Sequence, residues 1–114
     1  MKPTNEQVKK FWGWCGFRVA LGKLYWYPDK ESSPARRLPP IDLNNLFKYA
    51  VPKLEKSVRA ITIYPPVIDP PVCDKCYVEL TLCNGQIIES FENTPALALF
   101  WAIWEVIEGE VINE

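Results

Sequence analysis

The sequence predicts an α+β fold, in which helices pack on the faces of a mainly antiparallel sheet of about five strands. Short β-prone runs separated by turn residues predict the strands, and an Asn-Gly pair at positions 84–85 is the clearest hairpin signal. Helix-start residues at Thr4, Asp42 and Thr94 alternate with these strands. Because 114 residues are enough for one hydrophobic core, we expect a single domain over residues 1–114.

The first helix is expected to begin at Thr4. This residue is a good N-cap, and Gln7 three positions later completes a capping-box pattern. Gly16 is placed to end the helix in a left-handed conformation. Apolar side chains recur at the spacing of one helix face, at Val8, Phe11, Trp12 and Cys15.

A hairpin and a loop are expected next. The run FRVALGKLYWY contains two short β-prone segments around positions 21–22. Residues 28–40 are polar and contain four prolines, so we expect a loop without helix or ladder there.

The second helix is expected to start at Asp42, with Ile41 and Leu46 placed as a hydrophobic staple. Pro52 lacks a backbone N–H, so we expect a kink or a restart near Val51. The predicted buried stripe comprises Leu46, Phe47, Ala50, Val51 and Leu54.

The run SVRAITIY is a predicted strand, and CYVELTLCNGQIIESF is a predicted hairpin. We expect Asn84 and Gly85 to be the central residues of its type I′ turn. The proline-rich segment 65–71 between them is expected to be a stiff excursion that keeps two strands from pairing directly.

The last helix is expected to have Thr94 as its cap, Pro95 at its first position and Gly109 just past its end. Its body is apolar nearly all round, which predicts burial on more than one side, by the sheet and another element or by a second copy of the chain. A partner or homodimer interface on this helix would comprise Leu97, Phe100, Trp101, Trp104, Glu105 and Glu108.

The net charge is −1, so no basic field is present to attract nucleic acid or anionic lipid. Residues 84–114 contain acids but no Lys or Arg, which suits a protein partner. No signal-peptide pattern and no apolar run near the ~20 residues of a membrane span occurs, so we expect a cytoplasmic protein with free thiols.

Cys73 and Cys76 have CxxC spacing, which suggests half of a zinc site or a redox pair. The chain has no His, and an extended strand would separate Cys76 from Cys83 by roughly 23 Å, too far for one zinc ion. A redox pair would sit at a helix N-terminus, whereas this one precedes a strand. We therefore interpret Cys76 as a core residue that shares a strand face with Val78, Leu80 and Leu82.

The absence of His also excludes Ser-His and Cys-His catalytic pairs, and no glycine motif for phosphate binding occurs. We expect no enzyme and no cofactor.

The aromatic run Tyr25, Trp26 and Tyr27 is followed by Arg36 and Arg37. Rings beside guanidinium groups can hold a nucleotide or another planar anion. The competing interpretation is that alternate rings pack in the core while the arginines solvate a loop.

The segments LPPIDLNNLFKYAVPKL and TPALALFWAIWEVIEG resemble the paired helices of small phage and prophage proteins grouped as the phage ABA sandwich domain family. EQVKKFWGWCGF resembles the lead-in of some members. The resemblance implies an α/β/α sandwich and a phage origin, but it carries no functional residues.

Together these features predict a phage or prophage accessory protein that acts by binding in the cytoplasm of an infected or lysogenic bacterial host. The main hypothesis is contact with a host protein that inhibits a process such as antiviral defence. One alternative is a sponge that sequesters a nucleotide-type signalling molecule at the aromatic and arginine residues. A zinc-stabilised structural module is a further alternative through Cys73 and Cys76.

Overall fold

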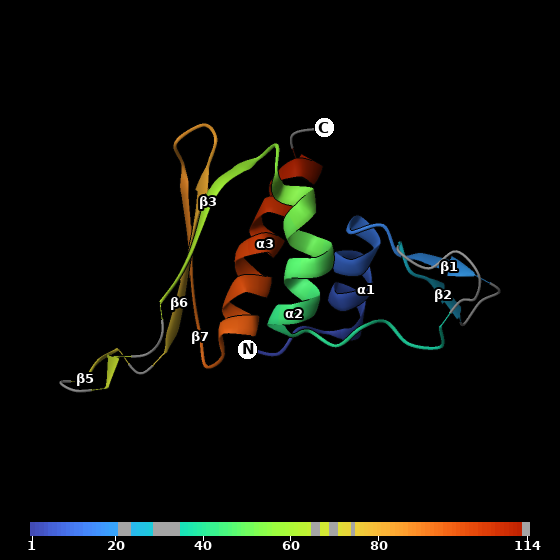
Figure 1. Cartoon of the computed structure of the whole chain (residues 1–114), viewed down its shortest axis with the longest axis horizontal. Helices are drawn as coiled ribbons and strands as arrows, with labels where there is room; N and C mark the ends of the chain where they lie inside the picture. Colours follow the sequence, from blue (N-terminus) through green and yellow to red (C-terminus); the bar gives the residue numbers. More distant parts are fainter. Residues whose placement is uncertain (21–23, 29–34, 65–66, 69–70, 74, 113–114) are drawn as a thin grey trace. The chain divides into compact units, whose positions relative to one another are not determined.

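The computed structural model describes the following parts of the chain: residues 1–20, 24–28, 35–64, 67–68, 71–73 and 75–112. The chain divides into two compact units, Lys2–Pro40 and a second one formed by Met1 with Ile41–Glu114. The expected single domain therefore stays a prediction. The elements confirm the α+β class, and they follow the predicted order of helix, hairpin, helix, strand, hairpin and helix (Figure 1). The structure adds one short pair of strands, β4 (Val67–Ile68) and β5 (Pro71–Cys73), between the predicted strand and the second hairpin.

Helix α1 (Asn5–Trp14) of the first unit begins as predicted. The Thr4 hydroxyl accepts the backbone N–H of Gln7 at 3.2 Å, and the Gln7 side chain accepts the N–H of Thr4 at 2.9 Å. Gly16 follows the helix with a φ of +108°, the left-handed conformation that glycine adopts without strain. The predicted apolar face is confirmed for the buried residues Phe11, Trp12 and Cys15.

The rest of this unit is a small antiparallel hairpin of β1 (Arg18–Ala20) and β2 (Leu24–Trp26). The turn predicted at positions 21–22 lies outside the described residues. The Trp12 indole N–H donates to the Pro39 carbonyl at 3.0 Å, a buried hydrogen bond that ties α1 to the end of the proline-rich loop.

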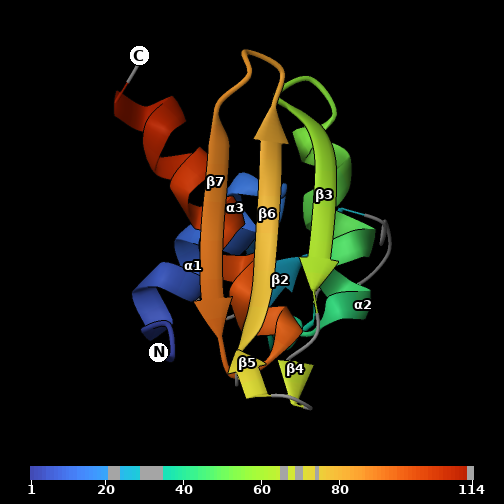
Figure 2. The same cartoon turned by 90° about the vertical axis from the view of Figure 1, so that its left-hand side faces the viewer.

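The second unit contains a three-stranded antiparallel sheet in the order β3 (Val58–Tyr64), β6 (Cys76–Leu82) and β7 (Ile87–Glu92). Helix α3 (Pro95–Ile112) packs on one face of it, here called the inner face. In Figure 2 the sheet lies in front, with α2 and α3 behind it. The buried core between sheet and helices contains Cys76, Val78, Leu80, Leu99, Phe100, Ala102, Ile103 and Ile107, together with Leu46, Ala50 and Leu54.

The helical segment after Asp42 changes its winding along its length. The Asp42 carboxylate accepts the N–H of Asn45 at 2.8 Å, which confirms the predicted cap. The chain then passes from α2 (Leu43–Asn45) into the π-helical η1 (Leu46–Ala50) and the 3₁₀-helical η2 (Val51–Leu54). This change of helix type next to Pro52 is the predicted interruption, because proline offers no N–H to continue the α-helical ladder.

Phe47 does not belong to the buried stripe of this segment. It is 45% exposed, whereas Leu46, Ala50 and Leu54 are buried. The π turn is wider than an α turn, so the buried row follows a spacing of four residues and Phe47 falls on its flank. The prediction that Phe47 is buried was wrong.

The described strands do not form one sheet of five. β1 and β2 pair only with each other among the described strands, and β4 (Val67–Ile68) and β5 (Pro71–Cys73) form a separate short pair. Both helical segments of the second unit also lie on the same face of its sheet, so this sheet is not the centre of a sandwich within that unit (Figures 1 and 2).

The proline-rich segment does not keep its neighbours apart. β3 and β6 pair directly, with Tyr64 opposite Tyr77 and Val58 opposite Leu82. The prediction failed because β4 and β5 pair with each other and not with β3 or β6, so they do not compete with this ladder.

The hairpin between β6 and β7 is confirmed, but its turn is not type I′. The N–H of Gly85 donates to Leu82 at 3.0 Å and that of Leu82 donates to Gln86 at 2.8 Å, which defines a three-residue loop. Gly85 has a φ of +92° at the last loop position. The prediction that the last helix ends just before Gly109 was also wrong, because α3 continues to Ile112. A glycine inside a helix lowers its stability but does not have to end it.

Candidate functional site

The face of the second unit's sheet that points away from α3, here called the outer face, carries a regular set of exposed and half-buried side chains. Alternation along the strands places one residue in two on this face, and the register aligns them in three rows across β3, β6 and β7. The rows are Tyr64, Tyr77 and Phe91; Thr62, Glu79 and Glu89; and Ala60, Thr81 and Ile87.

Tyr64, Tyr77 and Phe91 form an aromatic row at one end of the outer face. The Tyr64 and Tyr77 ring centroids are 5.2 Å apart at 26°, and those of Tyr77 and Phe91 are 4.7 Å apart at 28°. Cross-strand aromatic pairs stabilise a sheet. Even so, Tyr64 is 47% exposed and Phe91 is 50% exposed, so the row presents a strip of stacked rings to solvent.

Glu79 and Glu89 form a carboxylate pair in the next row, directly opposite each other on β6 and β7. The Tyr77 hydroxyl donates to Glu79 Oε1 at 3.2 Å. Partial burial raises the pKa of Tyr77 to about 12, and the Glu79 and Glu89 carboxylates act in the same direction. Within the described part of the chain, neither carboxylate has a basic side chain at ion-pair distance.

A like-charged pair directly across two strands destabilises a sheet. The rings, by contrast, stabilise the sheet through their stacking, yet the outer two stay about half exposed. The outer face therefore combines three features that a ligand could satisfy: exposed ring surface, two carboxylates without a basic partner among the described residues, and an apolar residue, Ile87, that is 55% exposed. These features suit recognition by stacking and by charge.

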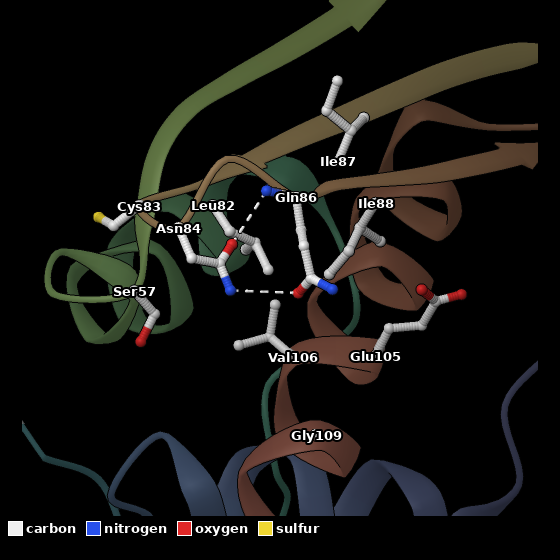
Figure 3. A pocket seen from close by; sticks show the side chains of 10 residues that line it. All are labelled: Ser57, Leu82, Cys83, Asn84, Gln86, Ile87, Ile88, Glu105, Val106 and Gly109. Atoms are coloured by element: carbon white, nitrogen blue, oxygen red, sulfur yellow. Dashed lines mark hydrogen bonds between the residues drawn. The ribbon is translucent and has the colours of Figure 1, made fainter.

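A pocket of about 880 Å³ lies between the β6–β7 hairpin end and the C-terminal half of α3 (Figure 3). The Asn84 side chain accepts the N–H of Gln86 at 2.9 Å and donates to its side chain at 3.2 Å, which holds the rim. Of the lining residues, Glu105 carries the charge. The lining comprises Ser57, Leu82, Cys83, Asn84, Gln86, Ile87, Ile88, Glu105, Val106 and Gly109.

The aromatic run and the arginines predicted as a nucleotide site lie next to each other in the first unit. Tyr25 and Ala35 exchange backbone hydrogen bonds at 2.8 and 2.9 Å, and the Tyr27 hydroxyl donates to the Arg37 carbonyl at 2.7 Å. The Tyr27 ring packs against Phe17 with centroids 4.8 Å apart. The half-buried residues are Tyr25, Trp26 and Tyr27, and the exposed ones are Arg36 and Arg37.

The structure corrects the predicted interface on the last helix at one position. Phe100 is fully buried and cannot contact a partner. The Trp101 indole N–H donates to the Met1 carbonyl at 2.8 Å, and the Met1 ammonium pairs with Glu92. Of the other predicted residues, Glu105 is exposed, and the half-buried ones are Leu97, Trp101, Trp104 and Glu108.

The cysteine side chains of the second unit that the structure describes are one core residue and one surface residue. Cys76 is buried on the inner face with Val78 and Leu80, which confirms its predicted place, and Cys83 is exposed in the hairpin loop. The Cys73 side chain lies outside the described residues. Among the residues that are described, no three side chains able to bind a metal ion come together.

Sequence reasoning missed the outer face. Each of its residues stands at an alternate position of a predicted strand, so the signal was present in the period-2 pattern of SVRAITIY, CYVELTL and IIESF. The pattern does not predict the register between the strands, and it is this register that aligns the three rings in one row.

The chain matches no protein-family model, no curated protein and no solved structure. The resemblance to the phage ABA sandwich domain family stays a prediction. No helix in the described ranges is long and apolar enough to cross a membrane.

Proposed function

We propose that this chain is a non-enzymatic binding protein that contacts another protein through the outer face of its sheet. The aromatic row supports this proposal, because its outer rings are half exposed although the inner face buries its apolar side chains. Aromatic side chains are enriched at protein interfaces and lose little conformational entropy on binding. Stacking between Tyr64, Tyr77 and Phe91 fixes the rings in advance, which lowers this cost further.

If the resemblance to phage proteins is right, the partner is a protein of the bacterial host. Binding would then inhibit a host process such as antiviral defence by covering a surface of the host protein that the process needs.

Two alternative functions, a nucleotide sponge and a zinc-stabilised module, are also proposed. The nucleotide sponge draws support from the proximity of Tyr27 to the Arg37 backbone. The hairpin pocket does not favour such a ligand, since the Glu105 carboxylate at its wall repels phosphate. A zinc-stabilised module would have to use Cys73 and Cys76.

A matched pair of photo-crosslinking variants tests the main proposal. Phe91 on the outer face and Phe47 on η1 are the same residue type and are exposed to nearly the same extent, 50% and 45%. Benzoylphenylalanine at each position is activated in cells that produce the chain. Crosslinked products are identified by mass spectrometry.

The proposal predicts a discrete heterologous protein adduct at position 91 that is absent at position 47. Tyr64→Ser in the same chain should reduce the adduct, since it removes the ring at the other end of the aromatic row. Equal adducts at both positions, an adduct with a second copy only, or no adduct would overturn the proposal.

A further inference from the structure

We infer that the outer face recognises a protein segment that bears arginine side chains, whose guanidinium groups bind the Glu79–Glu89 pair beside the aromatic row. This inference rests on the proposed function and adds the chemistry of the partner. Two observations support it: Glu79 and Glu89 have no basic partner among the described residues, and they lie in the row next to the aromatic row.

The two carboxylates are placed to act together. Glu79 and Glu89 are direct partners across β6 and β7, so their Cβ atoms are about 4.5–5.5 Å apart. A guanidinium group has five N–H donors in a planar fork, which can bond two neighbouring carboxylates at once. A bound cation also removes the repulsion between the two carboxylates, so free energy lost in folding is recovered on binding.

The carboxylate pair suits arginine better than a simple cation, because the planar guanidinium fork can bond both carboxylates at once. Along each strand, the aromatic row and the carboxylate pair are two residues apart, or about 7 Å. The Tyr77 ring is stacked on one side by Tyr64 and on the other by Phe91, so the open ring faces lie at the two ends of the row, where other side chains of the arginine-bearing segment can pack. The Tyr77 hydroxyl already donates to Glu79, which holds that carboxylate toward the rings.

The remaining row provides a place for the arginine stem. Ile87 and Thr81 lie on the far side of the carboxylate pair, and Ile87 is more than half exposed. The methylene groups of an arginine side chain cover apolar surface while the charged head reaches polar partners.

A peptide titration followed by NMR tests this inference. The probe is a capped octapeptide of alternating serine and arginine, and its control carries citrulline, the neutral isostere, in place of arginine. Both are titrated into the ¹⁵N-labelled full chain at low salt. The variants are Glu79→Gln with Glu89→Gln, and Glu105→Gln with Glu108→Gln as a matched acidic pair on α3.

The arginine peptide should shift the amide signals of β6 and β7 around Glu79 and Glu89, and it should bind about tenfold more tightly than the citrulline peptide, or about 1.4 kcal/mol. The Glu79→Gln, Glu89→Gln variant should lose this difference, and the α3 variant should keep it. Unchanged spectral dispersion shows that each variant is folded.

Equal affinity for the two peptides, or shifts that map to α3, would overturn the inference. The same glutamine variant also separates the two proposals. If the crosslink at position 91 survives in it, the outer face binds a partner without arginine recognition. If the crosslink disappears with both the glutamine variant and Tyr64→Ser, both proposals stand.

Discussion

Replacing Glu89 with glutamine should stabilise the protein, because it removes one of two like charges that face each other across β6 and β7. Two unit charges about 5 Å apart in water repel by about 0.8 kcal/mol. Screening reduces this energy to about 0.7 kcal/mol at about 10 mM salt and to about 0.15 kcal/mol at about 1 M. Glutamine keeps an oxygen that can accept a hydrogen bond, so the substitution changes mainly the charge.

Urea unfolding at both salt concentrations measures the effect. We expect the free energy of unfolding of Glu89→Gln to exceed that of the native chain by about 0.5 kcal/mol at low salt, with the gain shrinking at high salt. Glu79→Gln should give a similar gain, and the double variant should add little, because either substitution alone abolishes the repulsion.

Additive gains in the double variant would show that each glutamate responds to something other than its partner. A destabilised Glu89→Gln, or a gain that does not depend on salt, would refute the reasoning outright. A confirmed gain would mean that the chain carries a pair of charges at a cost in stability, as binding sites often do.

Three further outcomes are expected. The environment of Tyr77 raises its pKa to about 12, above the unfolded value of about 10, so its contribution to stability should be lost as the pH rises from about 10 to about 12. Phenolate absorbance should show one tyrosine that titrates late, and Tyr77→Phe should remove that signal. Trp12→Phe should lower the free energy of unfolding by about 1–3 kcal/mol in urea, since it leaves the buried Pro39 carbonyl without its donor. Leu80→Ala should cost about 2–5 kcal/mol in the same assay, whereas Ile87→Ala, which is largely exposed, should change stability by less than about 0.5 kcal/mol.

Local signals in the sequence were sufficient for the parts of the fold that depend on neighbouring residues. The caps at Thr4 and Asp42 satisfy N–H groups three positions away, so their pattern can be read without tertiary information. The all-round apolar body of α3 likewise predicted burial on more than one side, and α3 packs against β6 and β7 and also against η1.

Properties set by distant partners could not be predicted in this way. Phe47 fits an α-helical stripe, but the change to π winding before Pro52 shifts the buried row away from it. The number of strands in a sheet depends on which hairpins pair with each other. The local sequence does not indicate that β1 and β2 pair separately from β3.

The aromatic row depends on a single feature of the β6–β7 turn. A type I′ turn at Asn84 and Gly85 would shift the register by one residue and place Glu92, not Phe91, opposite Tyr77. Every side chain of β7 would then change faces, which would bury Glu89 against α3. The three-residue loop avoids this, because Gly85 takes a positive φ and Asn84 accepts the N–H of Gln86.

The same loop therefore determines both the core and the candidate site. It turns Ile88 and Ser90 toward the helices, and it turns Glu89 and Phe91 outward beside Glu79 and Tyr77. A two-residue turn would bury the Glu89 carboxylate without a partner, which costs free energy. The three-residue loop avoids that cost, and the same register places Glu89 and Phe91 on the outer face. The aromatic row and the carboxylate pair are therefore linked to the burial pattern of β7, because the register that keeps Glu89 in water also places Phe91 beside Tyr77.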